Sequence, residues 1–168
     1  MICSLIVSVG HAQQDNFFSE WRPNSPARGI KYVGNNACVE CHKEQAAQLH
    51  TPMGQAMEVA PDCRIVTAKG KLTFRNGGYT YNIERVGNAI NYTISDGTNS
   101  LSKPILYCFG QGHVGQTFLF RHNNMLYETR VSYFEKVRGL DLTIGHRPAP
   151  PSSLEDALGR AIAGEEPQ

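Results

Sequence analysis

The segment over residues 71–134 alternates apolar and polar side chains, and this alternation limits the folds open to the chain more than any other feature. Apolar residues recur at every second position in several short runs, at Leu72 and Phe74, Tyr79 and Tyr81, Ile90 and Tyr92, and Phe118 and Phe120. Alternate side chains of a strand point to opposite faces of its sheet. We therefore expect roughly six short antiparallel strands with one buried face.

Short turn sequences separate these runs. Asn76-Gly77-Gly78 lies between KLTFR and YTYNIER, and such residues favour the tight turn of a β-hairpin because they tolerate positive φ angles. Val86-Gly87-Asn88 and Asp96-Gly97 mark the next two turns. Strands that follow one another through short turns pair in antiparallel fashion, so the segment is expected to form a meander.

Helical patterns occur on both sides of the predicted sheet. Over residues 36–49, Ala46 and Leu49 share a face with His42, and Pro52 ends the pattern. A second short helical piece is expected over residues 54–59. Near the C-terminus, residues 152–163 carry an apolar stripe, and the spacing of Ser152 and Glu155 is typical of a capping box.

The first predicted helix carries Cys38-Val39-Glu40-Cys41-His42, the pattern that attaches haem c to a polypeptide. Two thiols three residues apart on one helical turn face the same way, so both can form thioethers with the vinyl groups of one porphyrin. The next residue, His42, is then placed beneath the iron as its proximal ligand. A thioredoxin-like pair needs a βαβ context and a zinc site needs a second pair of ligands, and the sequence offers neither.

The fold class expected from these patterns is α+β. A short haem-bearing helix precedes an antiparallel β-meander sheet, and a short C-terminal helix follows it. The cofactor is expected to be one covalently attached haem c, held by Cys38, Cys41 and His42.

The distal ligand of the iron is predicted to be Met53. This methionine follows the Pro52 turn, where the chain can leave the helix and return over the other face of the ring. A thioether ligand favours reduced iron and raises the potential relative to two histidines. His50 is disfavoured because it shares a predicted helix with His42 and serves the same side of the ring.

Other residues remain open as distal ligands. They are Met57, His113 and His146, the two histidines lying in glycine-rich loops that can approach a cofactor closely. His122 lies beside the Asn123-Asn124 turn and is expected to face solvent.

The other cysteines bear on the compartment. Besides the haem motif, the chain contains Cys3, Cys63 and Cys108. In an oxidising compartment Cys63 and Cys108 are candidates for a disulfide, and burial as two free thiols is the alternative.

Residues 1–12 favour export. An apolar run over residues 2–9 precedes small residues at Gly10 and Ala12, as at a signal-peptidase site, and it is too short to span a membrane. No Lys or Arg precedes the run, so a retained N-terminal anchor or a buried strand stays open. Residues 13–168 then form one domain, with an arm and the haem helix over 13–60. The expected location is periplasmic or otherwise extracytoplasmic, either free or membrane-associated.

The stretch YVGNNACVECHKEQAAQLHTPMGQAM resembles the first haem segment of bacterial multihaem c-type cytochromes, including members with tetratricopeptide repeats. The resemblance continues through KLTFRNGGYTYNIER, FGQGHVGQTFLF, YETRVSYF and GLDLTIGH, and it covers most of the chain after residue 30. In related proteins a histidine often occupies the place of Met53 and binds the iron, which supports Met53 by position. Family members carry further haem motifs and this sequence has one, so a single-haem unit is expected.

These observations predict a monohaem electron-transfer protein rather than an enzyme. Its partners are expected to be a redox donor and acceptor protein, met in the periplasm or on a membrane respiratory or photosynthetic complex. A net charge of +1 gives no reason to expect nucleic acid. The alternative is a haem enzyme or sensor whose open distal site binds peroxide or a small gas, with His113, Arg121 or Arg130 as an acid. A third option is an assembly subunit in which haem is mainly structural.

Overall fold

The computed structural model describes residues 35–162 of the 168-residue chain. The predicted signal or anchor over residues 1–12, the start of the arm, and Cys3 lie outside the described residues. So does the end of the predicted C-terminal helix, at residue 163.

The described part of the chain is mostly antiparallel β-structure, so the predicted α+β class is wrong. Seven strands are hydrogen-bonded in the order β10-β7-β6-β5-β4-β3-β2, and β1, β8 and β9 join this sheet off that path. The α-helices described are short, namely α1 (Asn35–Cys41), α2 (Arg64–Lys69) and α3 (Leu154–Leu158). The predicted architecture, a haem-bearing helix followed by a simple meander, is therefore wrong as well.

The first half of the sheet contains the predicted hairpins. Its strands are β2 (Lys71–Asn76), β3 (Tyr79–Val86), β4 (Ala89–Ser95) and β5 (Ser100–Phe109). Gly77 and Gly78 both have positive φ angles, as a two-residue hairpin turn requires. In β4 the alternation predicted from the sequence is complete, because Ile90, Tyr92 and Ile94 are buried while the residues between them are not.

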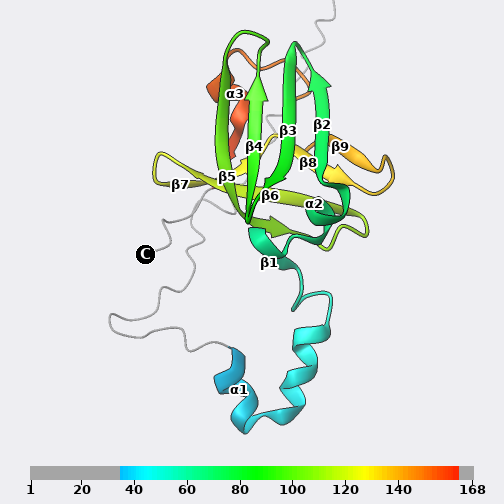
Figure 1. Ribbon diagram of the computed structural model, residues 1–168. Helices are drawn as coiled ribbons and strands as arrows, with labels where there is room; N and C mark the ends of the chain where they lie inside the picture. The colour runs from blue at the N-terminus through cyan, green and yellow to red at the C-terminus, as the bar shows by residue number, and fades with distance from the viewer. Residues whose placement is uncertain (1–34, 163–168) are drawn as a thin grey trace, which may run out of the picture. The chain divides into compact units, whose positions relative to one another are not determined.

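The sheet curls because β5 changes partner half-way along its length. Residues 100–104 pair with β4, and residues 105–109 pair with β6 (Gly115–His122). The register shifts between Ile105 and Tyr107. An irregularity of this kind bends a strand and increases its twist. Figure 1 shows the result, with β6 running at a steep angle to the upright strands β2 to β4.

Three further strands extend the sheet from β6. They are β7 (Met125–Thr129), β8 (Val131–Phe134) and β9 (Gly139–Leu142). The far end of β6 pairs with β7, whereas its first residues, Gly115 and Gln116, pair with β8. A row of aromatic rings connects β4 with β6 and β7. The ring centroids of Tyr92 and Phe120 are 5.7 Å apart, and those of Phe120 and Tyr127 are 5.6 Å apart. Such pairs add about 0.5–1.5 kcal/mol each beyond their burial.

Two of the predicted helical segments are replaced in whole or in part by strands. Residues 54–59 form no helix, and instead β1 (Met57–Val59) pairs with the end of β5. The helix predicted over residues 152–163 stops at Leu158, and β10 (Gly159–Ala161) then pairs with β7. The capping residue is Ser153, whose side chain accepts a hydrogen bond from the amide of Asp156, rather than the predicted box of Ser152 and Glu155.

Two 3-10 helices complete the described elements, η1 (Lys43–His50) and η2 (Ala60–Asp62). No helix within residues 35–162 is both long and apolar enough to cross a membrane.

Candidate functional site

The haem motif begins in α1. Cys38 and Cys41 both belong to this helix and are three residues apart. Positions with this spacing lie on one face of an α-helix, one turn apart. Cys41 is exposed as a free thiol. The local backbone therefore fits the attachment of one porphyrin through two thioethers.

His42 stands where the helix ends. Its φ and ψ angles of −113° and 72° are not helical, and η1 starts at the next residue. The predicted continuous helix over residues 36–49 is therefore wrong, because it breaks at His42 and resumes as a 3-10 helix. The imidazole is 67% exposed, and its Nδ1 lies 3.9 Å from Oε1 of Glu44. At this distance the Glu44 carboxylate makes no hydrogen bond to the ring, so both nitrogens of the exposed imidazole are open to a ligand.

The favoured distal ligand, Met53, is 80% exposed in the turn after η1. Thr51 shapes this turn, since its hydroxyl donates to the carbonyl of Gln48 at 2.7 Å and accepts from the amide of Gly54 at 3.1 Å. Gln111 also contacts the segment, because its Nε2 donates to the carbonyl of Pro52 at 3.1 Å.

The alternatives divide into exposed and engaged side chains. Met57 is 56% exposed on β1, opposite Phe109 of β5, and His113 and His50 are exposed as well. His146, in contrast, has a side chain only 5% exposed, with Nε2 3.7 Å from Oε2 of Glu128. Binding iron through His146 requires this side chain to leave its burial site.

His122 does not face solvent as predicted. Its side chain is 11% exposed, Nε2 lies 2.9 Å from Oε2 of Glu155, and the ring packs edge-on against Tyr127.

Cys63 and Cys108 form a buried thiol pair. Cys63 directly precedes α2, Cys108 lies on β5, and both are free thiols with no exposed surface. The pKa of Cys108 is raised well above that of an ordinary thiol. The main cause is the hydrogen bond with the Cys63 thiol, and burial is the second cause. The two cysteines that the sequence suggested as a disulfide pair therefore lie next to each other. The disulfide itself stays a prediction.

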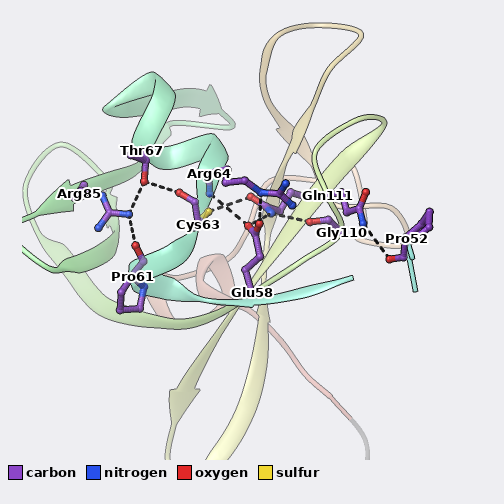
Figure 2. Close-up of polar contacts among 10 residues, drawn as sticks. Pro52, Glu58, Pro61, Cys63, Arg64, Thr67, Arg85, Gly110 and Gln111 are labelled. Carbon is purple, nitrogen blue, oxygen red and sulfur yellow. Dashed lines mark hydrogen bonds and ion pairs between the residues drawn. The ribbon is translucent and has the colours of Figure 1, made fainter. Parts of the chain in front are cut away.

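A polar network surrounds Cys63, and Figure 2 shows most of its members. The Cys63 thiol donates to Oε1 of Gln116 at 3.1 Å. The Gln116 amide nitrogen donates to the carbonyl of Gly110 at 2.7 Å and to Oε2 of Glu58 at 3.1 Å. Glu58 in turn forms a 2.5 Å ion pair with Arg64. Gln116 therefore connects β6, the Gly110 loop and β1 through one side chain.

The loop with the sequence FGQGHVGQ has a structural role that the sequence interpretation did not assign. At Gly112 the φ angle is +78°, and a Cβ atom there would lie 2.5 Å from Ile65 of α2. Gln116 occupies an inward position in the alternation that continues with Phe118 and Phe120, and it is 1% exposed. A polar residue in an apolar register was the signal that could have identified this network.

Next to the network, a surface cavity of about 530 Å³ is lined by residues that include Met57, Glu58, Val59 and Arg64. The cavity therefore combines one ion pair with exposed apolar side chains of β1.

Within residues 35–162, no group of three or more His, Cys, Asp and Glu side chains is arranged to hold a metal ion. Comparisons with protein-family models, with curated proteins and with solved structures found no match to this chain.

Proposed function

We propose that this protein is a monohaem c-type cytochrome that transfers electrons between partner proteins. The observation that carries the proposal is the local arrangement of the haem motif. Cys38 and Cys41 share one turn of α1, and an exposed His42 follows at the point where that helix ends.

In this proposal Cys38 and Cys41 hold the group covalently. Each thiol would add to one vinyl group of the porphyrin, its sulfur bonding to one vinyl carbon and its proton going to the other. His42 would bind the iron through a nitrogen of its exposed imidazole, and the Glu44 carboxylate lies 3.9 Å from Nδ1 of that ring. The bound haem supplies one-electron chemistry, and the chain sets its potential through ligand choice and burial.

Met53 is proposed as the distal ligand. Its side chain is 80% exposed and uncommitted to the core, and the hydrogen bonds of Thr51 fix the turn that precedes it. Met57 and His113 remain the accessible alternatives. With both His42 and Met53 bound, the haem would supply one-electron transfer without an open position for a substrate.

The enzyme alternative has less support. It needs an acid beside an open iron, and Arg130, one of its three candidates, is 5% exposed and donates to the carbonyls of Arg147 and Ala149.

The proposed partners are a redox donor and a redox acceptor protein. Residues 1–12 favour work in the periplasm, either free or docked on a membrane electron-transfer complex.

The visible spectrum and the reduction potential test this function. Electron transfer through a Met-ligated iron predicts a low-spin spectrum with a weak far-red band in the oxidised protein, and slow cyanide binding. Met53→Ala should abolish the band and allow rapid cyanide binding, whereas the matched control Met57→Ala should change neither. An oxidised wild-type protein that is high-spin and binds cyanide at once would instead favour the enzyme or sensor.

A further inference from the structure

A second cavity lies away from the haem motif, where the loop after β9 meets β10 and α3. Its volume is about 360 Å³, and its lining includes Arg130, His146, Arg147, Asp156 and Arg160. Three guanidinium groups and one imidazole thus surround one small space. Nothing in the proposed electron transfer uses these residues.

Arg130 is the most unusual member of this set. It is 5% exposed, and its Nη2 donates to the carbonyls of Arg147 at 2.8 Å and Ala149 at 2.7 Å. Its Nε is buried and has no hydrogen-bond partner. No carboxylate of residues 35–162 lies within 4.0 Å of this guanidinium. Because arginine stays protonated in proteins and buried charges are normally paired, this cation lacks a counter-ion.

His146 provides a second unpartnered group. Its side chain is 5% exposed, and its buried Nε2 has no hydrogen-bond partner, since Glu128 at 3.7 Å is too far away. Burial, followed by the charge of Arg160, lowers the pKa of His146, so the ring is neutral near pH 7. A neutral imidazole can still donate one N–H to an acceptor.

The carboxylates near the cavity do not balance its cations. Glu128 pairs with Arg160, whose Nε lies 2.7 Å from Oε2. Asp156 lines the cavity but is exposed, and its Oδ2 accepts from the backbone amide of Ser152 at 2.8 Å. Against this single remaining carboxylate stand two guanidinium groups, those of Arg130 and Arg147, for which the described residues provide no ion pair.

We propose that this cavity binds a small oxyanion of the phosphate or carboxylate class. A planar guanidinium matches the two oxygens of such a group and forms short, charge-assisted hydrogen bonds with it. Arg130 supplies the buried charge, His146 supplies a neutral donor, and Arg147 supplies a second charge from the rim. The oxyanion is either a free inorganic ion or the acidic end of a larger molecule, because the cavity has room for both.

Titration calorimetry on the purified protein tests the site, with inorganic phosphate and acetate as probes at constant ionic strength in chloride. We expect saturable binding of at least one probe, and the tighter one identifies the preferred class. Arg147→Gln should weaken that binding about tenfold. Arg121→Gln, which removes an exposed arginine of β6, should leave it unchanged and so controls for net charge.

Arg130→Gln should abolish binding, and circular dichroism establishes whether this variant folds. If Arg130→Gln does not fold, the Arg147→Gln variant still tests the proposal, because the Arg147 side chain is exposed and its loss should not prevent folding. Two results would overturn the proposal. One is the absence of saturable binding of either probe above the chloride background. The other is an equal loss of affinity in Arg147→Gln and Arg121→Gln.

Discussion

The Sγ atom of Cys63 donates a hydrogen bond to Oε1 of Gln116 at 3.1 Å; both side chains are buried, and the Cys63 thiol also contacts Cys108. This hydrogen bond connects the start of α2 with β6. Together with the contact between Cys63 and Cys108, it connects the segment after the haem motif with the sheet.

We predict that Cys63 and Cys108 form a disulfide when the protein matures in an oxidising compartment. The two thiols lose two protons and two electrons, which a disulfide-bearing oxidoreductase accepts by thiol–disulfide exchange. Closing this loop contributes roughly 3–5 kcal/mol in the chain-entropy model. Mass spectrometry of alkylated, unreduced protein tests the bond, and two alkylated cysteines at these positions would show that it does not form.

Gln116 is expected to contribute to stability through its three hydrogen bonds. Gln116→Ala removes the acceptor of the buried Cys63 thiol, and it removes the donor to the partly buried Gly110 carbonyl and Glu58 carboxylate. We expect a loss of about 2–3 kcal/mol in the free energy of unfolding, measured by urea denaturation. Gln111→Ala is the matched control, because its one bond to Pro52 lies at the surface, and it should cost less than about 1 kcal/mol. Equal losses in the two variants would mean that the hydrogen bonds of Gln116 contribute no more to the free energy of unfolding than a single surface hydrogen bond.

The pairing of β10 with β7 depends on Gly159. Its φ angle is +139°, and a Cβ atom would lie 1.9 Å from the carbonyl oxygen of Glu128. Gly159→Ala should therefore destabilise the protein by more than about 2 kcal/mol. Gly87→Ala is the control, since that glycine also has a positive φ angle but open space around it. If both variants melt at the same temperature, this strand pairing is not present in solution.

The extent to which the sequence predicted the fold depends on how local each determinant is. Hairpins such as that of Gly77 and Gly78 were predictable, because turn chemistry and alternation lie in neighbouring residues. The pairing of Met57 with Phe109 was not, because the partner is 52 positions away and three residues carry too little pattern to distinguish strand from helix. The partner change in β5 has the same origin, and it is what overturned the simple meander.

The candidate site shows the same division. The chemistry of Cys38, Cys41 and His42 follows from spacing within one helical turn, so sequence alone suffices to propose it. The environment of His146 does not follow from its neighbours, because Glu128 and Arg160 come from β7 and β10. The glycine-rich loop around His146 suggested a side chain that can approach a cofactor, and the structure buries it.

His146 should make stability depend on pH. Its pKa in the folded protein lies below the ordinary value of 6.5, owing to burial and Arg160, with Arg130 adding to this and Glu128 opposing it. Below about pH 6.5 the unfolded chain therefore binds more protons than the folded chain at this residue. The free energy of unfolding should fall as the pH drops from 7.5 to 5.5.

Urea titrations at these two pH values, in buffer free of phosphate and acetate, measure the effect. His146→Gln should reduce the fall, since glutamine does not titrate and most carboxylates titrate at lower pH. A fall of the same size in the variant would assign the pH dependence to other groups.

A c-type cytochrome holds its haem covalently, and extraction of the haem decides whether this protein does. The full chain is matured in cells that have a cytochrome c assembly system, and then extracted with acidified acetone. We predict that haem stays with the polypeptide, and that its mass increases by one haem. The double variant Cys38→Ala, Cys41→Ala should carry none, while Lys43→Ala, an exposed neighbour in η1, should retain the full amount. Haem that extracts freely from the unaltered protein, or that stays bound in the double variant, would show that Cys38 and Cys41 do not attach it.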